Sequence, residues 1–489
     1  MLFNSYIFIL LFLPVTIAGW YFLHGRKARK AAFVFLLLMS LVFYGYNNVR
    51  YVPVIVASIL FNYGVSRLLV PGRIAKERVR KTVMGAGVAF NLGLIFYFKY
   101  FDFFLENMNT LFHGDFVMRN IALPLGISFF TFQQVSYLVD SYRGETSDYG
   151  FIEYAVFVTY FPQLVAGPIV LHDEMIPQFR DPARYRPLAG NMANGLIIFI
   201  LGLFKKVVIA DTFSGAVSWG YANTGILTSG DVFVVMLSYT FQIYFDFSGY
   251  CDMACGMARM MNIELPANFD SPYKSFSVRE FWKRWHMTLT RFLTRYVYVP
   301  LGGNRRGLAG TCVNTMIVFL LSGIWHGANW TFVLWGVLHG LLCVFERLTE
   351  NRIAKLHPVV KWAGTFFLVN ILWMLFRADS VTQWRALLST LFRMENTAVS
   401  GDLLFAFTVP ENLVLYGYGP LAFISSKIYG FPVWFLMLAA FLVCLLPENN
   451  VRLQKRQRTT AWMVPVCAVA FTWSLLTLSS EAVFLYFNF

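Results

Sequence analysis

Long apolar runs separated by short basic segments dominate the chain. Near the N-terminus, apolar runs at about 1–23, 31–46, 52–70 and 83–105 alternate with basic clusters at 26–30 and 71–81, and a more polar loop is expected at 106–120. Most of these runs approach the ~20 residues with which a helix crosses a bilayer. Basic loops favour the cytoplasmic side, so the pattern places both clusters inside and the N-terminus outside. The first run lacks a basic segment before it and a cleavage site after it, which predicts a retained helix.

The pattern becomes irregular between about 121 and 210. Polar and helix-breaking residues interrupt the apolar runs there: Pro124, Gly126, Gln133, Gln134, Asp140 and the segment YFPQLVAGPI at 160–169. Interrupted helices at membrane depth are found where backbone is buried in protein or lines a cavity. We therefore expect broken or re-entrant helices around a cavity, with ordinary kinks as the alternative. A basic loop at 179–187 follows.

The remaining runs complete an all-α polytopic membrane protein. They lie up to about 206 and then at about 231–248, 312–324, 330–345, 360–376, 403–416, 430–446 and 461–480, with a further basic loop at 452–458. The pattern predicts about eleven or twelve transmembrane helices, with re-entrant or amphipathic helices around a central cavity. We expect a single domain over 1–489, with N-terminal helices at 1–120, a catalytic core at 121–350 and C-terminal helices with an aromatic tail at 351–489.

Composition supports the membrane assignment and excludes a nucleic-acid partner. The chain is 57% hydrophobic and 18% aromatic, with 13% charged residues and a formal net charge of +14, whereas soluble domains have about 25% charged residues. The basic residues are spread over short loops rather than gathered in a hydrophilic domain, as expected for cytoplasmic loops. The six cysteines lie mostly in apolar runs, so we interpret them as small core residues and expect no metal site and no disulfide framework.

His326 lies in a long apolar stretch without charged residues. It belongs to IWHGANW at 324–330, and no Lys, Arg, Asp or Glu occurs between Gly307 and Glu346. Gly327 breaks the apolar run directly after it, which predicts that His326 faces a buried cavity. An ionisable residue in that position is a candidate functional site, and a hydrogen-bonded packing role is the alternative. Trp325 and Asn329 are candidates for shaping the same pocket, again with packing as the alternative.

A second histidine, His286, lies in a segment with a basic stripe. Read as one helix at about 100° per residue, the segment has two faces, with Arg284, Arg291 and Arg295 on one and Trp282, His286, Leu289, Leu293 and Val297 on the other. This pattern predicts a short amphipathic or re-entrant helix that turns His286 toward the apolar side. Packing is the alternative role here as well.

Two carboxylates and one tyrosine add to the candidate chemistry. Asp246 and Asp252 lie in YFDFSGYCD at 244–252, at or near membrane depth. We expect each to pair with arginines of the 279–295 segment or to orient a histidine, and a structural ion pair is the favoured role. The chain ends in FLYFNF, a composition typical of interface anchoring. If this tail returned to a cavity, Tyr486 would offer a nucleophilic oxygen.

Six ordered motifs together resemble one family of membrane enzymes. They are YFPQLVAGPI (160–169), YFDFSGYCD (244–252), NFDSPY (268–273), FWKRWH (281–286), LGGNRRG (301–307) and WHGANW (325–330). The chain is similar to the membrane-bound O-acyltransferase (MBOAT) family, and within it to the alginate O-acetylase branch, which includes peptidoglycan and cellulose O-acetylation proteins. The resemblance extends over nearly the whole chain.

The resemblance implies an inner-membrane enzyme that moves an acetyl group from cytoplasmic acetyl-CoA toward an extracytoplasmic polysaccharide, with no bound cofactor. It implies that His326 is the essential histidine, that His286 is a second important residue, and that Tyr486 holds the acyl group in transit. Since the chain has no extracytoplasmic sugar-binding domain, a periplasmic SGNH-type or similar acetyltransferase is the expected partner, besides membrane lipids.

The residues also fit the chemistry of acyl transfer. A neutral imidazole has its pKa near the working pH and can deprotonate an attacking hydroxyl. We expect His326 to be this base and His286 to position the donor or the oxyanion. Six basic residues are candidates for holding the phosphates of coenzyme A, with lipid headgroups as the alternative ligand: Lys283, Arg284, Arg291, Arg295, Arg305 and Arg306.

Other functions remain open at this point. D-alanyl transfer to teichoic acids from a carrier protein is an alternative within the family. A non-catalytic membrane scaffold for a periplasmic acetyltransferase would tolerate loss of His326. A transporter or channel would require charged residues on several spans, and the charge-poor helices of this chain disfavour it.

Overall fold

The computed structural model describes residues 1–146, 148–407, 430–445, 462–478 and 484–485, and all of the regular elements among them are helices. Its contacts divide the chain into two compact units. Unit 1 comprises Met1–Gly202, Tyr250–Ala267 and Gln454–Ala470, and unit 2 comprises Leu203–Gly249, Asn268–Leu453 and Phe471–Phe489. The single domain and its three-part division stay predictions.

Seven helical stretches among the described residues are long and apolar enough to cross a membrane. They are Phe8–Gly25, Tyr51–Leu69, Glu77–Phe112, Ser229–Met260, Gly307–His326, Trp330–Leu348 and Pro358–Arg377. Two shorter apolar helices, α22 (Phe431–Leu445) and α24 (Met463–Leu476), follow. The predicted all-α polytopic fold is confirmed. The total of eleven or twelve spans stays a prediction, because most of the run expected at 403–416 lies outside the described residues.

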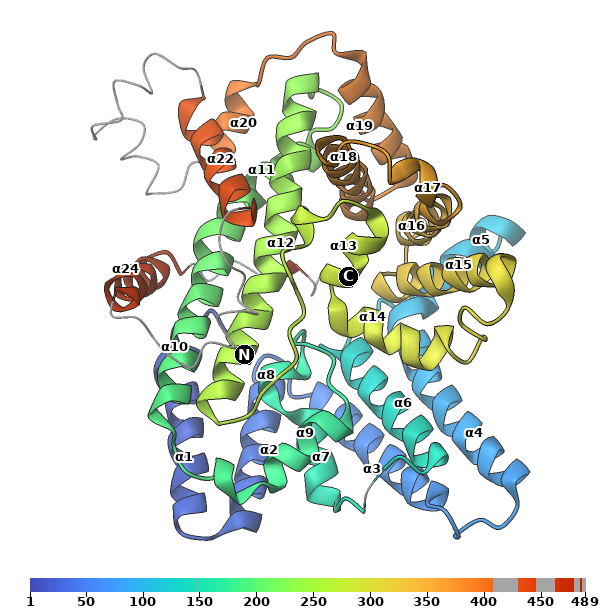
Figure 1. The fold of residues 1–489 in the computed structure, drawn as a ribbon, viewed down its shortest axis with the longest axis vertical. Coiled ribbons are helices and arrows are strands. Elements are labelled where there is room, and N and C mark those ends of the chain that lie inside the picture. The colour runs from blue at the N-terminus through green and yellow to red at the C-terminus, as the bar shows by residue number, and fades with distance from the viewer. Residues whose placement is uncertain (147, 408–429, 446–461, 479–483, 486–489) are drawn as a thin grey trace. The chain divides into compact units, whose positions relative to one another are not determined.

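Unit 1 begins with the N-terminal helices (Figure 1). Its helices are α1 (Leu13–Gly25), α2 (Arg29–Gly45), α3 (Tyr51–Leu69), α4 (Glu77–Ile95), α5 (Phe101–Phe112), α6 (Ile127–Arg143), α7 (Phe151–Thr159), α8 (Phe161–Leu164), α9 (His172–Arg180) and most of α10 (Ala189–Phe204). The unit also contains two π-helical turns, η1 (Phe8–Phe12) and η2 (Phe96–Tyr100), and one 3-10 turn, η3 (Pro182–Arg184). Buried amides join α3 and α4, where the Asn62 Nδ2 atom donates to Asn91 Oδ1 at 3.1 Å.

In unit 1, one helix boundary and one expected interruption differ from the prediction, and one predicted break is present. The polar loop expected at 106–120 begins later, because helix continues to Phe112. The run expected to be interrupted at Gln133, Gln134 and Asp140 is one continuous helix, α6, which buries these polar side chains against neighbouring helices. The break predicted at 160–169 is confirmed, since α7 ends at Thr159 and only the short α8 intervenes before α9.

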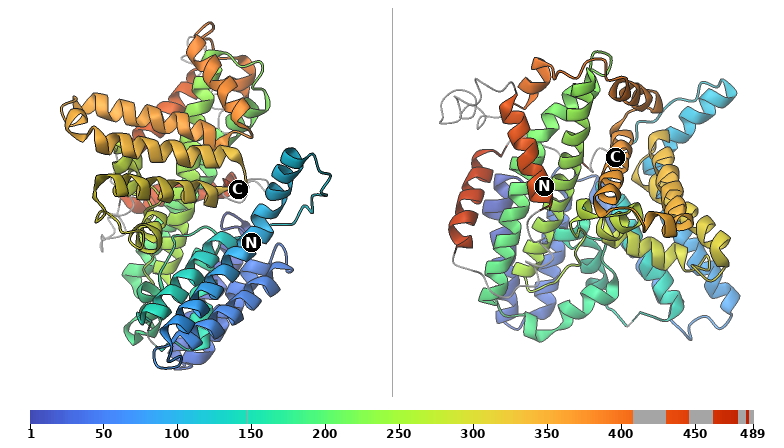
Figure 2. Two further views of the ribbon diagram at one scale, coloured as in Figure 1. Left: turned by 90° about the vertical axis from the view of Figure 1, so that its right-hand side faces the viewer. Right: turned by 45° about the horizontal axis from the view of Figure 1, so that its top comes forward.

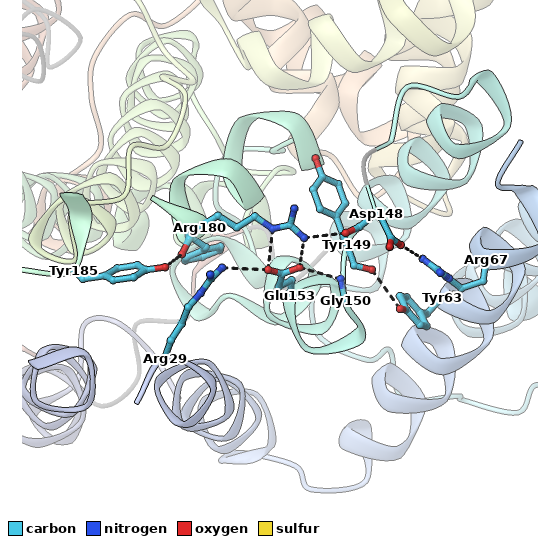
Figure 3. Close-up of polar contacts among 10 residues, drawn as sticks. Arg29, Tyr63, Arg67, Asp148, Tyr149, Gly150, Glu153, Arg180 and Tyr185 are labelled. Carbon is cyan, nitrogen blue, oxygen red and sulfur yellow. Dashed lines mark hydrogen bonds and ion pairs between the residues drawn. The ribbon is translucent and has the colours of Figure 1, made fainter. Parts of the chain in front are cut away.

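A network of charged side chains links several segments of unit 1 (Figure 3). Glu153 accepts from Arg180 Nε at 2.8 Å and pairs with Arg29 Nη2 at 3.4 Å. Arg180 also donates to the Asp148 carbonyl at 3.0 Å, and Arg67 pairs with the Asp148 carboxylate. Arg29 comes from the basic cluster at 26–30, which is predicted to be cytoplasmic, and Arg180 comes from the basic loop at 179–187. Because both arginines contact the Glu153 carboxylate, the two segments lie next to each other in unit 1.

Unit 2 contains both candidate histidines. Its elements include η4 (Lys205–Ala210), α11 (Asp211–Ala222), the first part of α12 (Ser229–Met260), η5 (Pro272–Lys274), α13 (Val278–Arg284), α14 (Met287–Leu293), η6 (Thr294–Tyr298), α15 (Gly307–His326), α16 (Trp330–Leu348), α17 (Glu350–Ile353), α18 (Pro358–Arg377), α19 (Val381–Arg393), α20 (Gly401–Ala406) and α22. The helix α16 packs against both α15 and α18, and the three form neighbouring rods in Figure 2.

Candidate functional site

The hairpin of α15 and α16 fixes the position of His326. The two helices cross closely at small residues, since a Cβ atom added to Gly336 would lie 2.4 Å from the Phe319 carbonyl oxygen. Helix α15 ends at His326, and Gly327 has extended backbone. A side chain at Gly327 would collide with the Phe332 ring, at 2.1 Å. The break predicted at Gly327 is therefore confirmed, and it leaves His326 at the last helical position.

His326 lies among aromatic rings. Its ring centroid is 5.2 Å from that of Trp335 and 5.1 Å from that of Phe376, and both rings meet the imidazole edge to face. Only 4% of the residue is exposed. Aromatic walls of this kind exclude water and hold an imidazole in one orientation. The cavity expected beside His326 stays a prediction.

His286 lies at a sharp break between two short helices rather than within one helix. The expected single amphipathic helix is wrong at this point, because α13 ends at Arg284 and α14 starts at Met287. His286 has left-handed backbone, with φ of 46°, which is costly for a residue with a Cβ and is retained when surrounding contacts enforce it. The predicted inward orientation is confirmed, since His286 is fully buried.

Asn268 holds the break at His286 together. The His286 Nδ1 atom lies 3.2 Å from Asn268 Oδ1, and the same oxygen accepts from the Thr288 hydroxyl at 2.9 Å and from the Thr288 amide at 3.2 Å. The Met287 amide donates to the Asn268 carbonyl. One asparagine thus fixes both the imidazole and the start of α14. Burial lowers the pKa of His286, which lies outside the seven candidate spans, so its imidazole is neutral at physiological pH.

Trp325 connects the two histidines. Its ring centroid is 4.9 Å from that of His326 and 6.0 Å from that of His286. On the other side, Phe247 of α12 meets the His286 ring edge to face at 4.9 Å. The structure therefore brings together His286 and His326, which are 40 positions apart in the sequence, around one buried indole.

A third histidine belongs to the same cluster and was not among the predicted residues. His339 of α16 is fully buried, and its Nδ1 atom accepts from Trp282 Nε1 at 3.2 Å. Its ring lies 4.7 Å from that of Trp335, which also contacts His326. The helical spacing of Trp335 and His339 was the available signal, because residues four apart share a helix face. Asn268 belongs to the NFDSPY motif, but its neighbours in the sequence do not indicate that it contacts His286.

The other predicted pocket residues have structural partners. Asn329 caps α16, with its Oδ1 atom accepting from the Thr331 amide at 2.9 Å and its Nδ2 atom donating to the Asp379 carbonyl at 2.9 Å. These bonds favour the packing alternative for Asn329. Trp325 is buried, with the contacts described above.

The six basic candidates differ in exposure. Lys283, Arg305 and Arg306 are exposed, whereas Arg291 and Arg295 are half-buried. Arg284 bonds to Glu280, with Nε donating to Oε1 at 3.0 Å, and its Nη1 atom donates to the Asp270 carbonyl. Arg284 thus holds the end of α13 to the 268–273 motif, while donor binding by all six stays a prediction.

Asp246 has a different partner from the one expected. It pairs with Lys206 of η4, not with arginines of the 279–295 segment, and the Lys206 Nζ atom lies 2.7 Å from both Asp246 Oδ1 and Asp211 Oδ1. Two of the arginines expected as partners pair elsewhere, Arg279 with Glu350 and Arg284 with Glu280. Asp252 is buried in unit 1. Within the described ranges, no group of three or more His, Cys, Asp or Glu side chains is placed to hold a metal ion.

Only part of the aromatic tail is described, and Tyr486 lies outside the described residues. Phe484 and Leu485 are buried. The Leu485 amide donates to Asp246 Oδ2 at 3.0 Å, and the Phe484 ring lies 6.2 Å from that of Phe247. These two residues of the tail therefore return to the helix that contacts His286.

The comparison with known families agrees with the resemblance of the six motifs. Residues 90–380 match the family described as MBOAT, membrane-bound O-acyltransferase family. This match covers more than half of the chain, and the chain belongs to this family. It is a membrane-bound acyltransferase, as predicted from the six motifs.

Individual relatives extend the likeness beyond the family segment. The chain is 36% identical to the peptidoglycan O-acetyltransferase of Helicobacter pylori, over 100% of this chain and 98% of that protein. It is 38% identical to the probable alginate O-acetylase of Pseudomonas aeruginosa, over 79% of this chain and 74% of that protein. The match to the teichoic acid D-alanyltransferase of Streptococcus thermophilus is weaker, at 28% identity over 49% of this chain and 60% of that protein.

Proposed function

We propose that this enzyme takes an acetyl group from cytoplasmic acetyl-CoA and passes it across the inner membrane for O-acetylation of an extracytoplasmic polysaccharide of the peptidoglycan or alginate class. The observation that carries the proposal is the pair of buried histidines around Trp325, one of them held by Asn268. The full-length likeness to a peptidoglycan O-acetyltransferase supports acetyl as the acyl group.

In the proposed reaction His326 is the general base. Its imidazole removes the proton of an attacking hydroxyl, the oxygen forms a bond to the thioester carbonyl carbon, and the carbon–sulfur bond breaks. The imidazolium then returns its proton to the thiolate of coenzyme A. The surrounding rings of Trp335 and Phe376 exclude the water that would otherwise hydrolyse the thioester.

His286 has a positioning role in this proposal. Its imidazole, held through Nδ1 by Asn268, orients the donor or stabilises the oxyanion that forms on the carbonyl oxygen. Tyr486 is the proposed carrier of the acetyl group in transit, as an aryl ester. A periplasmic acetyltransferase then completes transfer to the polysaccharide.

The weaker alternative is D-alanyl transfer from a carrier protein, and the choice of donor separates the two functions. Purified protein in proteoliposomes would receive either ¹³C-acetyl-CoA or a carrier protein loaded with D-alanine, with release of the free thiol measured for each donor. Thiol release from acetyl-CoA alone supports the proposal. Release from the D-alanyl carrier alone, or from neither donor in the presence of a functional periplasmic partner, would overturn it.

A further inference from the structure

We propose that Lys206 and Asp246 form a buried seat for the C-terminal tail, and that this seat holds the tail beside His286. The seat is a positioning device: it binds the backbone amide of Leu485 rather than a substrate atom. This inference deepens the proposed function, since a tail that carries the acetyl group must be held at the histidines.

The Lys206–Asp246 pair that forms the seat has a third charged neighbour, Asp211, and the three residues lie on separate helices. Lys206 and Asp246 expose only 3% and 2% of their side chains, and the Lys206 ammonium lies 2.7 Å from each of the carboxylates of Asp246 and Asp211. One cation therefore faces two carboxylates. A buried carboxylate is costly unless its oxygens receive hydrogen bonds or an opposite charge.

The two oxygens of Asp246 have different partners. Oδ1 faces Lys206 at 2.7 Å, and Oδ2 accepts from the Leu485 amide at 3.0 Å. Lys206 contacts Oδ1 of Asp246 and also Asp211, and the donor to Oδ2 of Asp246 comes from the tail. A hydrogen bond from a backbone amide to a buried carboxylate is stronger than one between neutral groups.

The neighbouring residues carry the tail toward the histidine. Phe247 follows Asp246 on α12, and its ring contacts both Phe484, at 6.2 Å, and His286, at 4.9 Å. Asp246 holds the backbone of the tail, while the adjacent Phe247 ring contacts both the tail and the imidazole. Because the bond to Asp246 uses a main-chain amide, it depends on the path of the tail rather than on the side chain at position 485.

Two variants at Leu485 test the seat without changing a buried charge. Leu485→Pro removes the amide hydrogen that Asp246 accepts, whereas Leu485→Ala keeps it. Hydrogen exchange of the C-terminal peptide, followed by mass spectrometry, reports whether the tail is held. We expect Leu485→Pro to raise the exchange rate of the other tail amides about 10-fold or more and Leu485→Ala to leave it near that of the wild type.

Variants of Asp246 and Asp211 test the acceptor of the hydrogen bond from the Leu485 amide. In Asp246→Asn the remaining oxygen stays with the Lys206 ammonium, and the new NH2 group faces the Leu485 amide, to which it cannot act as an acceptor. This variant should therefore release the tail, with exchange of the Leu485 amide about 10-fold faster or more. Asp211→Asn, which faces only the lysine, should keep the amide protected. Equal protection in both variants, or in both Leu485 variants, would overturn the seat. If Asp246→Asn fails to fold, the Leu485 pair still decides.

Activity then shows whether the seat acts through the tail. Asp246→Asn and deletion of residues 484–489 should each lower acetyl transfer, and their combination should lower it no further than the deletion alone. Additive losses would contradict a role through the tail. A wild-type protein that protects its tail amide but releases no thiol from acetyl-CoA would confirm the seat while contradicting the proposed function.

Discussion

The charged end of unit 1 and the buried centre of unit 2 use polar residues in opposite ways. Around Glu153, two arginines share one carboxylate at a partly exposed boundary, where solvent and salt weaken each pair. Around Trp325, two buried histidines are enclosed by aromatic rings, and one of them, His286, is hydrogen-bonded to Asn268. The comparison teaches that the ion pairs around Glu153 hold local structure, while a few buried polar groups carry the proposed chemistry.

The largest effect is expected at His326. His326→Gln removes the proposed base while keeping a polar side chain of similar size, and the initial rate of thiol release from acetyl-CoA should fall about 10²–10⁴-fold. His339→Gln is the matched control, because His339 is buried in the same cluster and its glutamine replacement keeps an acceptor for Trp282. Equal loss in both variants would indicate a packing role for both histidines.

The next effect concerns the support of His286. Asn268→Ala should lower the rate about 10–100-fold, the range typical of residues that orient a functional histidine. Asn268→Asp keeps the accepting oxygen and should restore part of the rate, with a pH–rate profile displaced to higher pH because the carboxylate favours the protonated imidazole. A purely structural asparagine would give an unchanged profile in Asn268→Asp.

A smaller effect is expected at the crossing of α15 and α16. Gly336→Ala places a methyl group against the Phe319 carbonyl and should lower the free energy of unfolding by about 1–3 kcal/mol. Gly364→Ala on α18 is the control, because nothing lies within 4 Å of the added Cβ there. Denaturant titration in detergent measures both variants, and equal stabilities would refute close packing at Gly336.

The smallest effect belongs to the charged end of unit 1. Burial alone would raise the pKa of Glu153, but Arg180, the Gly150 amide and Arg29 lower it below its ordinary value. The folded carboxyl therefore contributes stability above its unfolded pKa of about 4.3, and that contribution is lost as pH falls through the lower folded pKa. Glu153→Gln should reduce the unfolding temperature slightly at pH 7, and less as the pH approaches 4. A pH-independent difference would contradict this account, and acetyl transfer should be unchanged.

The sequence predicted the features that depend on local pattern. Apolar runs predict helices, and the proline and glycine residues of 160–169 and Gly327 predicted breaks that are confirmed. It did not predict the break at His286, because no glycine or proline lies there and a distant asparagine enforces the left-handed backbone. The Lys206–Asp246 pair was missed for the same reason, since its partners are 40 positions apart.

The central claim is that His326 moves an acetyl group onto the tail of this protein. The most direct measurement is mass spectrometry of the C-terminal peptide after purified wild-type, His326→Gln and His339→Gln proteins are incubated with ¹³C-acetyl-CoA. The account predicts label on Tyr486 in the wild type and in His339→Gln, and none in His326→Gln. Label that is retained at full level in His326→Gln, or an unlabelled tail in a wild-type protein that releases thiol from acetyl-CoA, would contradict it.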